Sequence, residues 1–181
     1  MQNDVMFAGF GGQGVLFAGQ LLAYAALDRG LEVTWIPSYG PEMRGGTANC
    51  SVVVSDEEIG SPLVKNPQAV VVFNGPSLDK YEPLVQSGGL LVVNTSMVTR
   101  QVTRPDVRAV YVPGTEMAEQ IAERKLTNMV MLGALLANQP ILPLEAVEQA
   151  LKDHLPARHQ RLLPANYQAL RAGAAFTPQK A

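Results

Sequence analysis

Short apolar runs alternate with amphipathic stretches along the 181-residue chain. The run "AVVVFN" at 69–74 is almost wholly apolar, which is typical of a central strand in a parallel sheet. The segment 12–30 instead repeats its apolar residues at a spacing near 3.6, which predicts a helix. The same reasoning predicts strands at 4–10, 31–37, 47–56, 69–74, 90–96 and 107–114, and helices at 12–30, 77–89, 115–125, 127–139, 142–155 and 157–176. Ser77 and Thr127 are the residues expected to cap two of these helices.

This alternation predicts an α/β fold, namely a single Rossmann-like three-layer domain over residues 1–176 with a mostly parallel sheet. The last third of the chain is expected to be helical, with an interruption at Pro164. Residues 177–181 are expected to form a frayed tail. The length suits one domain with a substantial core and leaves little room for two.

Composition excludes several functional classes. A formal charge of −2 gives no reason to expect nucleic acid or an anionic membrane as a partner. The single cysteine, Cys50, cannot supply an iron–sulfur cluster, and His154 and His159 are five residues apart, which does not suit a helical metal site. The start "MQND" lacks the features of a leader, so a cytoplasmic location is expected. Charged residues make up 17% of the chain, which fits either a surface covered by other subunits or a well-packed α/β protein.

A glycine-rich stretch, "GFGGQGVLFAG" at 9–19, follows the first expected strand. Gly9, Gly11 and Gly14 have the G-x-G-x-x-G spacing that lets a backbone approach a pyrophosphate. At the carboxyl edge of a parallel sheet, the amides and dipole of the following helix favour an anion. The alternative is a turn that serves only helix–strand packing.

An ordinary NAD site is disfavoured by the second expected strand. Such a site usually needs an acidic residue at the end of that strand to hold the ribose hydroxyls. Here the strand "LEVTWIP" runs into Ser38 and Tyr39, and Glu32 lies at its wrong end. The Gly-Lys-Ser/Thr of a P-loop is also absent.

The loop "PSYGPEMRGGTANC" at 37–50 is rich in residues with special backbone preferences. Tyr39, Glu42 and Arg44 are expected to project from it beside the glycine loop. Arg44 is suited to a phosphate or carboxylate, and Glu42 to pairing with Arg44 or with a neighbouring subunit. The alternative is an ordered turn with a surface ion pair. Asn74 and Asn94 end two further strands at the same edge, as crevice residues or as turn formers.

The stretches "GFGGQGVLFAGQLLAYAA", "SYGPEMRGGTANCSVVVSDEEIGSP" and "TNMVMLGAL" resemble the gamma subunit of the 2-oxoacid:ferredoxin oxidoreductases. The resemblance spans roughly residues 4 to 138. The second stretch looks closest to the 2-oxoglutarate branch, and the pyruvate and ketoisovalerate branches share part of these motifs.

The resemblance implies a non-catalytic subunit of a complex that oxidatively decarboxylates a 2-oxoacid to an acyl-coenzyme A and passes electrons to ferredoxin. It implies alpha, beta and possibly delta partner subunits, which carry thiamine diphosphate, magnesium and the iron–sulfur clusters. It also implies that the loop residues bind coenzyme A or face the alpha subunit; these are Gly9, Gly11, Gly12, Gln13, Gly14, Tyr39, Glu42 and Arg44. Two other hypotheses remain, a free-standing module that senses coenzyme A or a dinucleotide and a stand-alone dehydrogenase.

Overall fold

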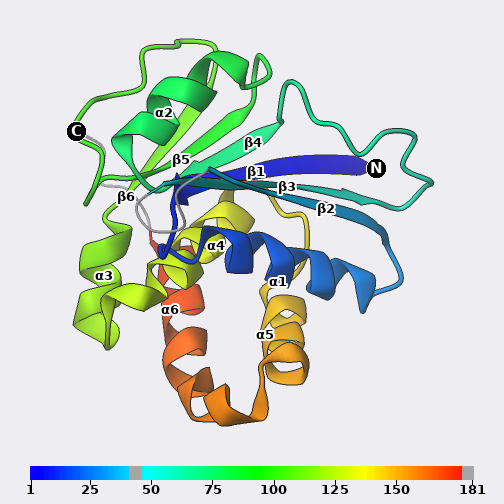
Figure 1. Cartoon of the computed structure of the whole chain (residues 1–181), viewed down its shortest axis with the longest axis vertical. Coiled ribbons are helices and arrows are strands. Elements are labelled where there is room, and N and C mark those ends of the chain that lie inside the picture. Colours follow the sequence, from blue (N-terminus) through cyan, green and yellow to red (C-terminus); the bar gives the residue numbers. More distant parts are fainter. Residues whose placement is uncertain (41–45, 177–181) are drawn as a thin grey trace.

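A computed structural model describes residues 1–40 and 46–176 of the chain. In the described residues, six strands form one sheet in the order β2-β3-β1-β4-β5-β6. The strands are β1 (Gln2–Phe10), β2 (Glu32–Tyr39), β3 (Thr47–Ser55), β4 (Ala69–Val72), β5 (Leu90–Asn94) and β6 (Arg108–Val112). Figure 1 shows them as one twisted layer between helices.

The expectation of a mostly parallel sheet is confirmed, since β1, β4, β5 and β6 run parallel to one another. The strand β3 differs, because it lies antiparallel between β1 and β2. A parallel neighbour needs a crossover of a dozen or more residues, and only residues 40–46 separate β2 from β3. Because β1 and β2 are both antiparallel to β3, they point the same way and end at the same edge of the sheet.

The helices cover the two faces of the sheet unequally (Figure 1). The helix α2 (Gly75–Tyr81) lies on one face, and the other five α-helices of the described residues lie on the opposite face. These five are α1 (Val15–Leu27), α3 (Gly114–Ile121), α4 (Thr127–Asn138), α5 (Leu144–His154) and α6 (Leu163–Ala175). The large core forms under the five helices and includes Phe7, Leu22 and Val52, whereas the smaller core under α2 includes Val72 and Leu78. The helical C-terminal third is confirmed, and α6 begins at the predicted interruption, with Pro164 in its first turn.

Helices α4 and α6 pack backbone against backbone. A Cβ atom added to Gly133 would lie 2.0 Å from the carbonyl oxygen of Leu170, and one added to Gly173 would lie 1.9 Å from that of Val130. No side chain fits at either position while the helices stay in place. The two glycines therefore set the close approach of α4 and α6.

The prediction that Ser77 and Thr127 cap helices is wrong for both residues. The N-cap of α2 is Asn74, whose side-chain oxygen accepts the amide hydrogen of Ser77 at 2.9 Å. The helix α4 begins at Thr127 directly after a 3₁₀ turn, η2 (Arg124–Leu126), and no side chain caps it. The Thr127 hydroxyl instead donates to the carbonyl oxygen of Arg124 at 2.7 Å.

A buried carboxylate fastens the segment after β5 to the end of α2. Glu82 is 3% exposed and accepts hydrogen bonds from the Arg100 guanidinium at 2.6 Å and from the Thr103 hydroxyl at 2.8 Å. Burial raises the pKa of this carboxyl, but the hydrogen bonds from Arg100 and Thr103 outweigh it, so the pKa lies below its ordinary value. The ionised form of Glu82 therefore stabilises this face of the molecule.

Candidate functional site

The glycine loop joins the end of β1 to the start of α1, and two of its glycines have a left-handed backbone conformation. Gly12 has φ +94° and Gly14 has φ +73°, a backbone region that favours glycine. At Gly14 a side chain is also excluded by contact, since a Cβ atom would lie 2.5 Å from the Asn128 amide nitrogen. At Gly12 a Cβ atom would meet nothing within 4 Å. The chain therefore keeps open space beside Gly12.

Hydrogen bonds hold this loop to the ends of the neighbouring strands. The Gly11 amide donates to the carbonyl oxygen of Gly46 at 2.9 Å. The Gln13 side-chain oxygen accepts from the Phe10 amide at 2.7 Å and from the Asn74 side chain at 3.2 Å. The Gly11 amide and the Gln13 side-chain oxygen thus have partners within the protein. By contrast, the amides in the first turn of α1 have no acceptor within the helix, as at every helix start.

Gly9 is required for packing. It lies buried in β1, where an added Cβ atom would lie 2.6 Å from the Gln13 side-chain oxygen and 2.9 Å from the Phe73 Cβ. It borders neither of the two pockets described next. The structure therefore explains this glycine by the close approach of β1 to its neighbours.

A shallow pocket of about 330 Å³ lies on one side of the glycine loop and brings Tyr39 to it. Tyr39 ends β2 and is 73% exposed. The walls are mostly apolar and come from the end of β1, the start of β3 and the first turn of α1; they include Phe10, Val15, Phe17 and Ala48. The predicted neighbours of Tyr39 in the sequence, Glu42 and Arg44, lie outside the described residues.

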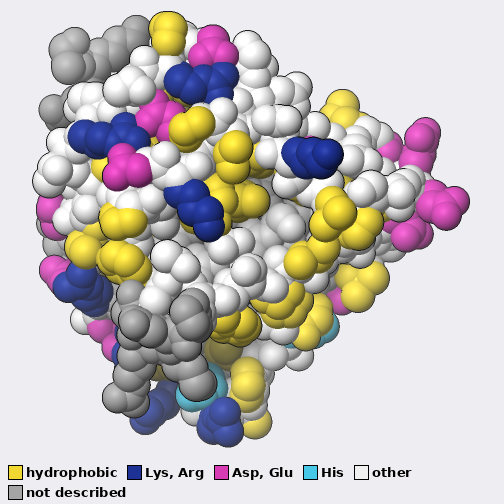
Figure 2. Space-filling model, turned by 45° about the horizontal axis from the view of Figure 1, so that its top comes forward, with side chains coloured by type: hydrophobic (Ala, Val, Ile, Leu, Met, Phe, Trp, Pro, Cys, Tyr) yellow, Lys and Arg dark blue, Asp and Glu magenta, His cyan; other side chains and the backbone are white. Residues whose placement is uncertain are grey.

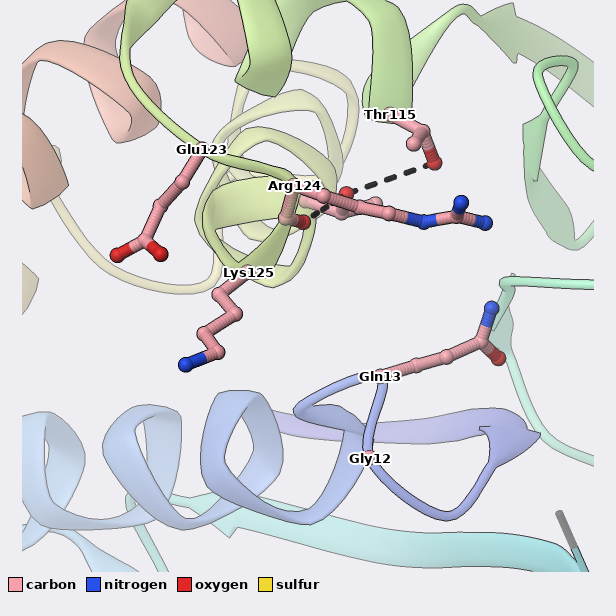
Figure 3. Close-up of a pocket in the computed structure, with 7 residues that line it drawn as sticks. Gly12, Gln13, Thr115, Glu123, Arg124 and Lys125 are labelled. Carbon is pink, nitrogen blue, oxygen red and sulfur yellow. Dashed lines mark hydrogen bonds between the residues drawn. The ribbon is translucent and has the colours of Figure 1, made fainter.

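A second pocket, of about 390 Å³, lies on the other side of Gly12. Gly12 and Gln13 form one wall, and the facing wall comes from the start of α3, the turn η2 and the start of α4 (Figure 3). The facing residues are Thr115, Glu123, Arg124, Lys125 and Thr127. Two cations, Arg124 and Lys125, therefore face the glycine loop, although they lie more than 100 residues after it in the sequence.

Asn128 fastens the two walls together. Its side-chain nitrogen donates to the carbonyl oxygen of Gly14 at 3.3 Å, and its oxygen accepts from the Met129 amide at 2.9 Å. The starts of α1 and α4 are thereby held side by side. The positive ends of both helix dipoles lie near the second pocket, which favours an anionic ligand there.

The two asparagines predicted at the carboxyl edge do lie there, and both are engaged within the protein. Asn74 caps α2 and contacts Gln13. Asn94 is fully buried, where its oxygen accepts from the Gly114 amide at 3.0 Å and its nitrogen donates to the Thr115 hydroxyl at 3.1 Å. Their turn-forming role is the one the structure supports.

Sequence reasoning missed the facing wall, namely Thr115, Arg124, Lys125 and Asn128. One signal was present, because two adjacent cations lie one residue before "TNMVMLGAL", itself one of the three stretches that carry the family resemblance. Cations just before a helix start are unfavourable to its dipole, which suggests that they are there for another reason.

Among the described residues, no group of three or more His, Cys, Asp or Glu side chains is placed to hold a metal ion. Cys50 is fully buried, and burial raises the pKa of its thiol to about 12. No helix in the described part of the chain is long and apolar enough to cross a bilayer.

Comparison with known proteins agrees with this architecture. A family described as pyruvate ferredoxin/flavodoxin oxidoreductase matches residues 4–176. The chain belongs to this family. Among its relatives, the 2-oxoglutarate synthase subunit KorC of Methanothermobacter thermautotrophicus is 39% identical over 163 residues, which cover 86% of each chain. The pyruvate synthase subunit PorC of Thermotoga maritima is 34% identical, over 94% of this chain and 92% of PorC.

The length of the oxidoreductase relatives varies. The ketoisovalerate oxidoreductase subunit VorA of M. thermautotrophicus is 40% identical over 171 residues, but the chain spans only 35% of its length. The solved gamma subunit of a keto/oxoacid ferredoxin oxidoreductase from Geobacter sulfurreducens has a TM-score of 0.81 and 28% identity, with 95% of this chain and 96% of that chain covered. The family resemblance to gamma subunits and the fold class are thereby confirmed.

One further structure supports the fold alone. A 2-oxoglutarate:ferredoxin oxidoreductase from Magnetococcus marinus, solved with 2-oxoglutarate, coenzyme A and succinyl-CoA bound, has a TM-score of 0.87 at 24% identity. This chain corresponds to 30% of that longer chain. The gamma fold therefore occurs both as a separate subunit and as part of a longer polypeptide.

Proposed function

We propose that the chain is the gamma subunit of a hetero-oligomeric 2-oxoglutarate:ferredoxin oxidoreductase and helps to enclose coenzyme A. In the overall reaction, 2-oxoglutarate and coenzyme A give succinyl-coenzyme A and carbon dioxide, and two electrons pass to ferredoxin. The observation that carries the proposal is Gly12, a left-handed glycine with open space beside it, placed between two pockets at the start of α1.

The loop suits a pyrophosphate-bearing ligand that needs no acidic residue for its ribose. Without a side chain at Gly12, a phosphate can approach the backbone closely. The first-turn amides of α1 supply donors, and the helix dipole favours the negative charge. The strand β2 ends in Tyr39, where an NAD site would place an acidic residue. Coenzyme A meets these conditions, and in this proposal it lies over Gly12 and Gly14 with Tyr39 beside it.

The catalytic chemistry is assigned to partner subunits of alpha and beta type, and possibly delta type. In this proposal they carry thiamine diphosphate, magnesium and the iron–sulfur clusters, because one buried cysteine cannot hold a cluster of the usual four-thiolate kind. The role of this chain is then to bind the coenzyme and to support assembly.

Exposed apolar side chains are consistent with a partner surface. Large apolar residues that are more than a third exposed include Ile36, Tyr39, Leu63 and Leu84. On the face where α2 lies, apolar side chains reach the surface in several groups between Lys and Arg side chains (Figure 2). Exposed apolar groups of this kind often mark protein interfaces.

The 2-oxoglutarate branch is proposed because the KorC relatives match the chain in both identity and length. The KorC subunit cited above is covered to 86%, whereas VorA, at similar identity, is almost three times as long as the matched segment. A pyruvate or ketoisovalerate complex is the alternative within the family. A tagged chain purified from its native extract decides between them, when the eluate is assayed for coenzyme A-dependent viologen reduction with each of the three 2-oxoacids. Activity on 2-oxoglutarate alone supports the proposal, and a chain that elutes without cluster-bearing partners overturns it.

The coenzyme role is tested by Gly12→Val in the assembled complex. We expect the KM for coenzyme A to rise about tenfold or more, because the side chain fills the space beside the loop. Gly30→Val is the matched control, since Gly30 also has a positive φ and open surroundings but lies at the far end of α1. An unchanged KM in Gly12→Val, in a complex that assembles normally, contradicts the coenzyme role.

A further inference from the structure

The turn η2 presents two adjacent cations, Arg124 and Lys125, at the surface of the pocket beside Gly12. Both are exposed, and neither takes part in an ion pair with another described residue. Within residues 1–40 and 46–176, the Arg124 side chain makes one hydrogen bond, from a terminal nitrogen to the Met97 sulfur at 3.1 Å, and a thioether sulfur is a weak acceptor. Most of its donors thus remain available to a ligand.

A buried network fixes the backbone that carries these cations. Asn94, which is fully buried, donates to the Thr115 hydroxyl, and Thr115 lies 3.4 Å from the hydroxyl of Thr127. Thr127 in turn donates to the carbonyl oxygen of Arg124. Thr115 and Thr127 are themselves nearly buried, at 6% and 5% exposure. The turn η2 is therefore fixed by contacts with buried side chains on its inner side, which an ordinary solvated surface turn does not need.

The orientation of the side chains agrees with a site shared with the glycine loop. Figure 3 shows Lys125 and Arg124 extending from the turn in opposite directions, Lys125 toward α1 and Arg124 above Gln13, whereas Glu123 is directed away from Gln13. Because Gly12 carries no side chain, nothing from the loop fills the space between the two walls. A ligand that extends from the loop into this pocket therefore meets a wall that carries both cations.

We propose that Arg124 and Lys125 bind the 3′-phosphate of coenzyme A; this rests on the proposed function. The pyrophosphate of coenzyme A carries one charge per phosphate, which suits backbone amides and a helix start. The 3′-phosphate is a monoester that carries about −1.5 to −2 charges at neutral pH. A doubly charged group is matched by two cations, one of which has a forked set of donors; both side chains are exposed and turn toward the phosphate when it binds. The two walls of the pocket thus recognise two chemically different phosphates of one ligand.

The proposal predicts selection of coenzyme A over dephospho-coenzyme A, which lacks only the 3′-phosphate. The assembled complex is expected to have a KM for coenzyme A at least about tenfold below that for dephospho-coenzyme A. The double variant Arg124→Ala/Lys125→Ala is expected to bring the two KM values to within about threefold of each other. Its KM for dephospho-coenzyme A should stay close to that of the native complex.

The control is Arg29→Ala/Lys152→Ala, which removes the same charge from exposed positions near the C-terminal ends of α1 and α5. It is expected to keep the full discrimination. If the double variant in η2 raises both KM values by the same factor, or changes neither, the 3′-phosphate assignment is overturned. If that occurs while Gly12→Val still raises the KM for coenzyme A, only the assignment fails. If neither variant affects either coenzyme, the proposed function fails with it.

Discussion

Replacing Gly133 by alanine tests the packing of α4 against α6. A Cβ atom at this position would lie 2.0 Å from the backbone oxygen of Leu170, so the helices must separate by about 1 Å to relieve the contact. A gap of this size forfeits about a quarter to a half of the dispersion energy of the atoms along the seam. For three or four large buried side chains, each worth about 1.5–3 kcal/mol, the loss is about 2–4 kcal/mol. The better helix propensity of alanine returns about 1 kcal/mol.

The net effect expected of Gly133→Ala is a loss of about 1–3 kcal/mol in the free energy of unfolding. For a domain of this size that corresponds to a fall in Tm of about 2–12 °C. Urea and thermal unfolding followed by far-UV circular dichroism measure both quantities. Gly75→Ala is the matched control, because Gly75 is also helical and an added Cβ atom there meets nothing within 4 Å. A Gly133→Ala variant as stable as Gly75→Ala would refute the reasoning.

Two further predictions concern buried groups. Glu82→Gln is expected to lower the free energy of unfolding by about 2 kcal/mol at neutral pH, because the ion pair with Arg100 is lost. Since the folded pKa of Glu82 lies below its unfolded value, the stabilisation is complete above the unfolded pKa and disappears as the pH falls through the folded pKa. Urea unfolding of both proteins from neutral to acidic pH gives the free energy of unfolding as a function of pH. A difference between the two proteins that stays the same at every pH contradicts the prediction. Cys50 is expected to react with iodoacetamide far more slowly in the native chain than in urea, since its pKa is raised to about 12 and it is fully buried. Mass spectrometry of the alkylated fraction measures the ratio, and equal rates contradict the burial.

The sequence predicted the central strands well because their signal is local. A run such as Ala69–Val72 is buried on both faces, so every residue in it is apolar. The direction of β3 was also open to prediction, since a connection as short as 40–46 favours an antiparallel neighbour. Strand direction was instead inferred from the alternation of strands and helices along the whole chain. That pattern predicts parallel strands and does not reveal the one antiparallel strand, β3.

The site was predicted only in part, for a related reason. The glycine loop has a motif of its own, and Tyr39 lies beside it because β1 and β2 end at the same edge. Arg124 and Lys125 have no motif, and their position depends on how α4 packs against the sheet and α1. That packing depends on contacts such as Asn128 with Gly14, between residues 114 positions apart, which no local pattern records.

The contact between Asn128 and Gly14 also bears on the order in which the molecule is made. The glycine loop is synthesised before the wall that faces it, which follows more than 100 residues later. The helix α6, which packs on α4 through Gly133 and Gly173, comes later still. Domains are synthesised at about 5–20 residues per second, so the nascent chain holds an incomplete site for several seconds at least. A nascent or truncated chain that ends before α4 therefore has the loop and the pocket beside Tyr39 but not the second pocket, and ligand capture there must await the synthesis of η2 and α4.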